Sequence, residues 1–264
     1  MRLRLNPPGA DGRVRVTYIV DRNLNPTNVC VTDGFCAFYR LPGDAEAYVL
    51  PREVIYQKVD EPWRRAASSQ ALQGGHHPRL KSDWFAALFA DLKQRYPQVW
   101  IHGMSPPEIT HLSKIEKRPV RAVLQDLKAA GLDSIPGGGA EILVERVRKI
   151  IAPKKATTDE WLEVFRQWAA LGGKGTATMM FGHVETDAER IEHMTRIRDS
   201  GAGDDAGRQR RVHRVHPVDV PARKHGDGRF DAGVARRQEG DGRRAPAHAE
   251  HGAALPAERA ARAV

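Results

Sequence analysis

Cysteines and long apolar runs are scarce in this chain, and each scarcity excludes a class of protein. The 264 residues contain two cysteines, Cys30 and Cys36, which is too few for a disulfide-stapled scaffold. No apolar run reaches the length of about 18 residues that spans a bilayer, and the first residues lack the apolar stretch of a secretory signal. We therefore expect a cytoplasmic protein without a membrane partner. In a reducing compartment, so close a cysteine pair indicates a metal or redox site.

Large apolar side chains nearly disappear after residue 199. Residues 201–264 contain one leucine, one phenylalanine and no isoleucine, methionine, tryptophan or tyrosine. Such a segment cannot bury enough apolar surface to offset its conformational entropy, so we expect residues 200–264 to be disordered or translated out of frame. The net charge of +9 raises nucleic acid as a partner. The tail lacks the interleaved aromatic residues that stack on single strands, so a basic nucleic-acid-binding protein is not the favoured hypothesis.

The preceding 199 residues alternate between strand-like and helix-like segments. Short β-branched runs end at Gly, Pro or Asp and lead into segments of helical period. The predicted strands are Val14–Val20, Val99–Met104, Leu132–Ile135 and Thr176–Phe181. The predicted helices are Ser82–Tyr96, Val120–Ala130, Ala140–Ile150, Thr158–Leu171 and Asp187–Arg198. This alternation predicts an α/β domain over residues 1–199, with parallel strands and crossover helices.

One segment interrupts the alternation. Residues 61–71 follow neither the helix period nor the strand period, although a helix should end there and a second strand should lead into Gln73-Gly74-Gly75. We expect that a compensated pair of frameshifts has altered the amino-acid sequence of this second strand.

The most specific motif surrounds the two cysteines. Thr27-Asn28-Val29-Cys30 and Phe35-Cys36-Ala37-Phe38-Tyr39-Arg40 follow the first predicted strand. They resemble the cluster loop of the radical S-adenosylmethionine enzymes, in which a C-x-x-x-C-x-x-C motif holds three irons of a [4Fe-4S] cluster. The resemblance implies this cluster and S-adenosylmethionine as cofactors, with Cys30 and Cys36 as metal ligands. Gly34 replaces the family's middle cysteine and the lysine after it, so two thiolates remain. By composition alone, the two cysteines could equally be small buried hydrophobic residues.

Four further segments resemble the futalosine cyclases of menaquinone synthesis, a branch of the same family. They are Leu72-Gln73-Gly74-Gly75-His76-His77-Pro78, Ser105-Pro106-Pro107-Glu108-Ile109, Pro136-Gly137-Gly138-Gly139-Ala140-Glu141 and Met179-Met180-Phe181-Gly182-His183-Val184-Glu185-Thr186. The resemblance implies a (β/α) TIM-type barrel. Because the sequence changes character after residue 199, we expect a partial, truncated barrel in which the sixth strand and those after it are lost.

The resemblance implies that four residues contact S-adenosylmethionine. Gly74 and Gly75 would let the cofactor approach the bare backbone closely. Glu141, at the start of the predicted helix 140–150, and Phe38, beside the cysteines, would contact the same molecule. Without the resemblance, the paired glycines would indicate a turn, and Glu141 would indicate a helix cap.

Four other residues are assigned to the substrate and the chemistry. Ser105 and His102, at the end of the third predicted barrel strand, would contact the substrate, since this end of a barrel carries the active site. Glu108 is better explained as a first-turn residue that interacts with the helix dipole. His183 and Glu185, which are two residues apart, would act in catalysis, although a lone histidine is more often structural.

By this resemblance, the reaction is radical cyclisation of dehypoxanthine futalosine in menaquinone synthesis. It implies a small-molecule nucleoside substrate and an electron donor such as flavodoxin or ferredoxin. With two thiolates in the cluster loop, we expect impaired activity. An inactive pseudoenzyme that retains nucleoside binding is the second hypothesis, and affinity for S-adenosylmethionine without its cleavage would support it.

Overall fold

The structure, a computed structural model, describes residues 21–32, 36–64, 69–201 and 212–219. These residues form a parallel sheet of six strands whose spatial order is their order in the chain. The strands are β1 (Asp21–Leu24), β2 (Ser69–Leu72), β3 (Trp100–Gly103), β4 (Ser134–Ile135), β5 (Lys174–Phe181) and β6 (Val212–Asp219). Parallel neighbours that follow one another in sequence require a crossover after each strand, so the predicted α/β class is confirmed. Within the described residues, β1 and β6 are the two edges, and the sheet is open between them.

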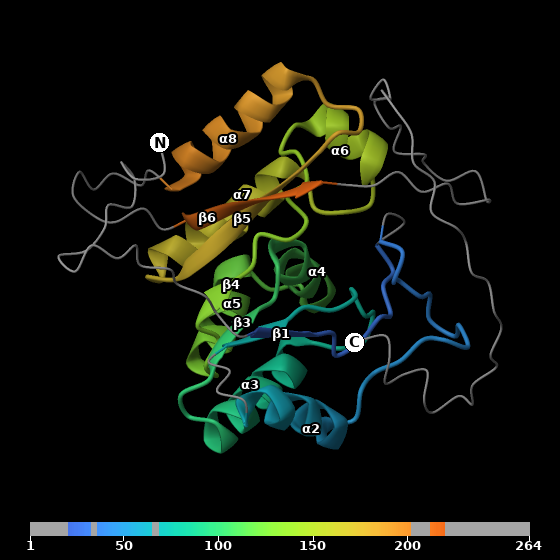
Figure 1. Cartoon of the computed structure of the whole chain (residues 1–264), viewed down its shortest axis with the longest axis vertical. Coiled ribbons are helices and arrows are strands. Elements are labelled where there is room, and N and C mark those ends of the chain that lie inside the picture. Colours follow the sequence, from blue (N-terminus) through green and yellow to red (C-terminus); the bar gives the residue numbers. More distant parts are fainter. Residues whose placement is uncertain (1–20, 33–35, 65–68, 202–211, 220–264) are drawn as a thin grey trace, which may run out of the picture.

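Helices supply the crossovers (Figure 1). They are α2 (Arg52–Trp63), α3 (Ser82–Arg95), α4 (Pro106–Glu116), α5 (Val120–Ala129), α6 (Glu145–Ile151), α7 (Thr158–Ala170) and α8 (Asp187–Gly201). The predicted helices 82–96, 120–130, 158–171 and 187–198 and the predicted strands 99–104, 132–135 and 176–181 are confirmed. The remaining predicted strand, 14–20, lies outside the described residues.

The helix predicted over 140–150 begins too early. The first helical residue of α6 is Glu145, and Ala140, Ile142 and Leu143 are instead fully buried in an irregular segment after β4. Apolar residues at these positions mimic a helical period, but they point into the core from a non-helical chain. Glu141 therefore does not lie at a helix start.

The second strand leads into Gln73 as the sequence predicts, whereas the predicted loss of the sixth strand is wrong. Ser69–Leu72 forms β2 and pairs along its whole length with both β1 and β3, from Asp21 opposite Ser69 to Leu24 opposite Leu72 on the β1 side. A sixth strand, Val212–Asp219, pairs with β5. In both cases the pairing with a neighbouring strand overrides a local sequence that lacks strand character.

The core lies between the sheet and the helices and reaches the loops at the strand ends. Leu88, Phe89 and Leu92 of α3 are completely buried, as is Trp161 of α7. The indole of Trp161 donates a hydrogen bond to the carbonyl of Gly138 at 3.1 Å, which fixes the glycine loop after β4 against α7. Among the described residues, none of the helices has the length and apolar character of a membrane span.

Candidate functional site

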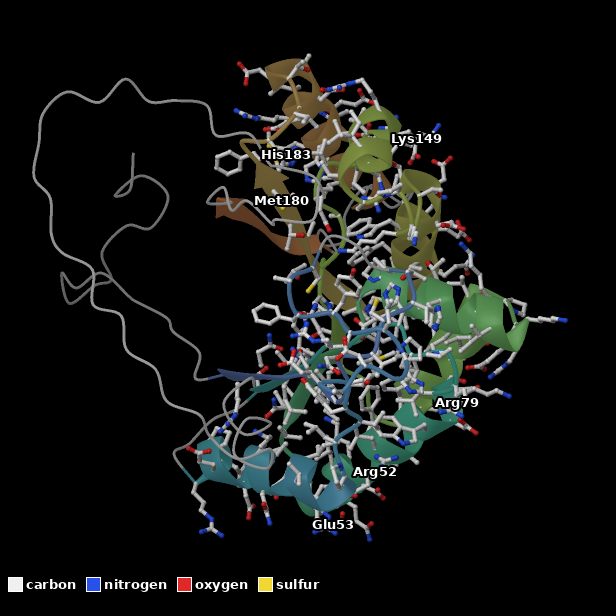
Figure 2. All side chains as sticks on the ribbon, turned by 90° about the vertical axis from the view of Figure 1, so that its right-hand side faces the viewer. Arg52, Glu53, Arg79, Lys149, Met180 and His183 are labelled. Carbon is white, nitrogen blue, oxygen red and sulfur yellow. The ribbon has the colours of Figure 1, made fainter. Side chains whose placement is uncertain are left out.

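A cavity of about 270 Å³ opens at the carboxyl ends of strands β1 to β4, the end at which parallel α/β folds bind ligands. Figure 2 looks onto this side of the molecule, with the cysteine loop in blue at the centre and His183 above it. The walls of the cavity come mainly from the loops that follow strands β1 to β4. The lining side chains discussed below are Cys30, Cys36, Phe38, His76, Ser105, Glu108 and Lys155, together with the backbone of Gly74 and Gly75.

The backbone of the cysteine loop is fixed on both sides. The amide of Cys30 donates to the carbonyl of Arg40 at 2.9 Å, and the amide of Val31 donates to the carbonyl of His76 at 3.1 Å. Cys30 is buried and Cys36 is half-buried. Both cysteines line the same cavity, and their loop is tied to the end of β2.

Two thiolates do not complete the ligand set of the implied [4Fe-4S] cluster. The sequence contains no third cysteine. In the part of the chain that the structure describes, no group of three or more His, Cys, Asp or Glu side chains is placed to hold a metal ion. The residues present therefore do not fit a cluster that is held by three protein ligands and keeps one iron open.

Gly75 allows the close approach of two backbone segments. A Cβ at Gly75 would lie 2.2 Å from the carbonyl oxygen of Val29, whereas one at Gly74 would lie 3.2 Å from that of Thr27. The amide of Gly75 also donates to the carbonyl of Thr27 at 2.8 Å. At Gly75 the bare backbone is thus needed by the cysteine loop itself, and the cofactor is not required to explain it. Both glycines line the cavity.

Ser105 lines the cavity and forms a capping box with Glu108 at the start of α4. Its hydroxyl donates to Oε2 of Glu108 at 2.6 Å, and its amide donates to the same oxygen at 2.7 Å. Glu108 is also in the wall of the cavity, where burial raises its pKa to about 7 although these hydrogen bonds favour the charged form. The sequence identifies the helix start correctly but misses the position of Glu108 in the cavity.

Glu141 reaches the cavity indirectly. It has a positive φ of 42°, which is unusual for a residue other than glycine, and its side chain is almost completely buried. Oε1 of Glu141 lies 3.1 Å from Nζ of Lys155, and Lys155 lines the cavity. No local pattern marks Lys155 in the sequence, because its partner is 14 residues earlier in the chain.

The other predicted residues are distributed unevenly around the cavity. Phe38 lies on its wall with an exposed side chain. His102 is in β3 but does not line the cavity, and its Nδ1 lies 2.7 Å from the hydroxyl of Ser134. The structure thus brings Ser105, but not His102, to the cavity.

His183 and Glu185 lie after β5, away from the cavity wall. Nδ1 of His183 is 3.1 Å from Oε2 of Glu185, and Nε2 is 2.9 Å from the carbonyl of Met180, its neighbour in Figure 2. Glu185 accepts hydrogen bonds from the amide of Gly182 and from Arg190. Burial acts to raise the pKa of Glu185, but these hydrogen bonds outweigh it and the pKa is lowered. The pair therefore organises the loop that follows β5.

Comparison with known proteins agrees with the fold and the cysteine loop. The sequence profile of the Radical SAM superfamily matches residues 24–197. The chain therefore belongs to the radical SAM superfamily. Enzymes of this superfamily use a [4Fe-4S] cluster and S-adenosylmethionine.

Two kinds of curated relative are similar to the chain over the same length. A 5-amino-6-(D-ribitylamino)uracil–L-tyrosine 4-hydroxyphenyl transferase of Methanosarcina acetivorans is 48% identical over 185 residues, which are 70% of this chain and 48% of the relative. A cyclic dehypoxanthine futalosine synthase of Halalkalibacterium halodurans is 41% identical over 185 residues, again 70% of this chain and 50% of the relative. Both relatives are enzymes. The chain spans about half the length of each of them.

Solved structures support the fold alone. The crystal structure of methylornithine synthase superposes with a TM-score of 0.60 at 15% identity, covering 82% of this chain and 58% of that one. A maturase of the [FeFe]-hydrogenase superposes with a TM-score of 0.62 at 12% identity, covering 82% of this chain and 47% of that one.

Proposed function

We propose that this chain belongs to the futalosine cyclase lineage and binds S-adenosylmethionine and a nucleoside substrate in the cavity. The reaction of that lineage is the radical cyclisation of dehypoxanthine futalosine. One observation carries the proposal: Cys30, Cys36, Gly74, Gly75 and Ser105, which come from three separate segments, all line one cavity at the carboxyl ends of the strands. The relative that is 41% identical and named as a futalosine synthase supports this branch.

The cavity offers complementary surfaces to a nucleoside and its attached groups. Phe38 presents a flat apolar ring, which can stack on a purine base. Gly74 and Gly75 present backbone to the ligand, and Ser105 presents a hydroxyl that already orders Glu108. His183 and Glu185 would then contact only a substrate that extends beyond the cavity to the end of β5.

The two-thiolate loop limits the chemistry in this proposal. Because Cys30 and Cys36 do not complete the cluster's ligand set, we expect this chain to bind its ligands and to be impaired in radical chemistry. The electron donor in the lineage reaction would be flavodoxin or ferredoxin.

A second candidate reaction is the transfer of a 4-hydroxyphenyl group from tyrosine to 5-amino-6-(D-ribitylamino)uracil. The observation that favours it is the 48% identity to a relative with that name, over the same 185 residues as the cyclase match. The two candidates share the cavity and differ in the substrates that it would hold.

Restoring the third cysteine tests the proposal. Replacing Gly34 with Cys-Lys recreates the family spacing, and replacing it with Ser-Lys gives a control of the same length without the thiol. After anaerobic incubation with iron, sulfide and a reductant, the Cys-Lys variant should hold about four irons per chain, and the Ser-Lys variant and the original chain should hold fewer. A full cluster in the original chain would overturn the claim of impairment.

The reaction is then identified by supplying each substrate set to the repaired variant. With S-adenosylmethionine and dehypoxanthine futalosine, we expect 5′-deoxyadenosine together with a cyclised product. Product formation only with tyrosine and 5-amino-6-(D-ribitylamino)uracil would replace the cyclase with the transferase. A repaired variant that holds its cluster but turns over neither set would contradict both.

A further inference from the structure

Three carboxamide side chains line the cavity at the ends of two neighbouring strands. Asn23 is in β1, Asn25 follows β1, and Gln73 follows β2. The amide of Gln73 donates to the carbonyl of Leu24 at 3.3 Å, and Leu24 pairs with Leu72 between the two strands. Asn25 and Gln73 therefore leave the sheet side by side, and Asn23 lies about 7 Å before Asn25 along the extended chain. We call Asn23, Asn25 and Gln73 the amide cluster.

The amide cluster differs from the other carboxamide in the wall, that of Asn28. Asn28 donates to the carbonyl of Glu46 at 2.9 Å and accepts the amide of Tyr48 at 2.8 Å, so its side chain holds the cysteine loop together. Within the part of the chain that the structure describes, the side chains of the amide cluster make no hydrogen bond. Their donors and acceptors are therefore not used to build the fold.

The end of Gln73 reaches across the cavity to the loop after β4. A Cβ at Gly138 would lie 3.0 Å from Nε2 of Gln73 and 3.4 Å from Cβ of Ser105. The missing side chain at Gly138 thus leaves room for the carboxamide of Gln73. Because the indole of Trp161 holds the carbonyl of Gly138 at 3.1 Å, this loop is a fixed wall for Gln73.

The chemistry of a carboxamide restricts the group that it can bind. Each one is uncharged and carries an oxygen that accepts and an NH₂ that donates two hydrogen bonds. A carboxylate or phosphate offers acceptors alone and would leave the amide oxygens without a donor. A hydroxyl both donates and accepts. Since the cluster extends over about 7 Å along β1 and continues onto β2, it matches several hydroxyls along a chain better than a single polar group.

We propose that the amide cluster binds the neighbouring hydroxyls of a pentose or of an open pentitol chain. The inference rests on the cavity of the proposed function and adds the chemical class of the group that this wall recognises. Three sources of such hydroxyls are compatible with the proposed reactions: the sugar of dehypoxanthine futalosine, the ribityl chain of 5-amino-6-(D-ribitylamino)uracil and the ribose of S-adenosylmethionine.

Calorimetric binding with three pairs of ligands tests the inference. Dehypoxanthine futalosine and S-adenosylmethionine are each paired with an analogue that lacks two adjacent sugar hydroxyls. The third pair is 5-amino-6-(D-ribitylamino)uracil and 5-amino-6-(pentylamino)uracil. The original chain should bind the hydroxyl-bearing member of at least one pair about tenfold more tightly, which corresponds to about 1.4 kcal/mol. The pair that shows the preference identifies the source of the hydroxyls.

Substitutions in the amide cluster should remove this preference. Asn23→Leu, Asn25→Leu and Gln73→Met keep the approximate size of each side chain and remove its hydrogen-bonding groups. Each should reduce the preference, and the triple variant should abolish it without weakening the analogue that lacks the hydroxyls. Gln73→Glu should preserve part of the preference, because a hydroxyl can donate to a carboxylate oxygen.

An exposed glutamine on α2 supplies the control. Gln57 does not line the cavity, so Gln57→Met should leave the affinity for both members of each pair unchanged. Because the amide cluster makes no hydrogen bonds within the described part of the chain, its variants should also keep the circular dichroism spectrum and melting temperature of the original chain. The three single variants report separately, so a fold defect in one leaves the other two to decide.

Three outcomes would overturn the inference. They are equal affinities within every pair in the original chain, a preference that survives in the triple variant, and an equal loss of affinity for both members of a pair in that variant. The last outcome would place a ring or another part of the ligand on the amide cluster. These comparisons are made at equilibrium and need no turnover, so a repaired variant that makes no product would contradict the proposed reactions while the preference for hydroxyls could still be measured.

Discussion

Oε1 of Glu108 accepts a hydrogen bond from the amide of Gly74 at 2.9 Å, which joins the end of β2 to the first turn of α4. The other carboxyl oxygen of Glu108, Oε2, accepts hydrogen bonds from the amide and the hydroxyl of Ser105. One carboxyl group thus organises two loops that line the cavity. Burial raises its pKa to about 7, so its charge changes near neutral pH.

The stability that Glu108 contributes should fall as the pH rises. Its pKa is about 7 in the folded chain against an ordinary value of 4.5, so the folded state holds the proton more tightly between these values. The contribution is complete below pH 4.5 and lost as the pH passes 7, a change of about 3 kcal/mol. Urea unfolding of the chain and of Glu108→Gln across pH 4 to 8 measures it. If the difference in unfolding free energy between the chain and Glu108→Gln did not vary with pH, the raised pKa of Glu108 would be contradicted.

His193 should have the opposite dependence on pH. Its ring is buried, its Nδ1 accepts the amide of Leu143 at 3.0 Å, and burial lowers its pKa from 6.5 to about 4. The unfolded chain therefore takes up the proton first. The contribution of His193 to the free energy of unfolding is complete above pH 6.5. It is lost as the pH falls to 4, again a change of about 3 kcal/mol. His193→Asn keeps an acceptor for Leu143 and removes this titration.

The two groups titrate in overlapping ranges and their effects oppose each other. Between pH 4.5 and 6.5 the contributions of Glu108 and His193 should largely cancel in the original chain. Over this range, stability should therefore rise with pH in Glu108→Gln and fall with pH in His193→Asn. The same slope in both variants would show that at least one of the two side chains is not buried as described.

The sequence predicts best those parts of the fold that depend on neighbouring residues. Thr157, just before α7, and Glu160, in its first turn, form a capping box, so the signal for this helix start lies within four neighbouring residues. By contrast, β2 and β6 exist because they pair with adjacent strands, and this pairing depends on residues far away in the chain. Composition therefore led to the wrong expectation for the sixth strand, whereas the expected second strand is present with residues of little strand character.

The same limit applies to the site. The cysteines and the Gly74-Gly75 pair are parts of contiguous motifs, so the sequence singles them out, and the structure brings them to one cavity. Glu108 is recognisable as a helix-start residue, but its bond to Gly74 crosses 34 positions. Whether Glu141 faces a cavity or a counter-ion depends on where Lys155 lies, and only the folded chain shows that.

Gly75→Ala should displace the cysteine loop. The added Cβ would lie 2.2 Å from the carbonyl oxygen of Val29, which is backbone and cannot rotate away. Overpacking of this kind costs about 1–3 kcal/mol. Gly74→Ala is the matched control, because its Cβ would approach the carbonyl of Thr27 no closer than 3.2 Å. Denaturant unfolding should show the larger loss for Gly75→Ala, and the rate at which a thiol reagent modifies Cys30 should rise in that variant alone. Equal losses in the two variants would argue against the close contact.

Arg148 should be essential for the loop that carries Glu141. The residue is 3% exposed, and its guanidinium donates to the carbonyls of Gly139, Ala140 and Ala156 at 3.0, 2.7 and 3.1 Å. Arg148→Met would remove the donor from two buried carbonyls and one half-buried carbonyl, at a cost of about 1–3 kcal/mol for each buried acceptor left unpaired, although removal of a buried charge offsets part of the loss. We expect a net destabilisation of about 3 kcal/mol in urea unfolding.

Arg146 provides the control on the same helix. It is exposed and pairs with Glu189 at the surface, so Arg146→Met should have a much smaller effect. If both variants lost stability equally, the carbonyl contacts of Arg148 would not be what holds this loop.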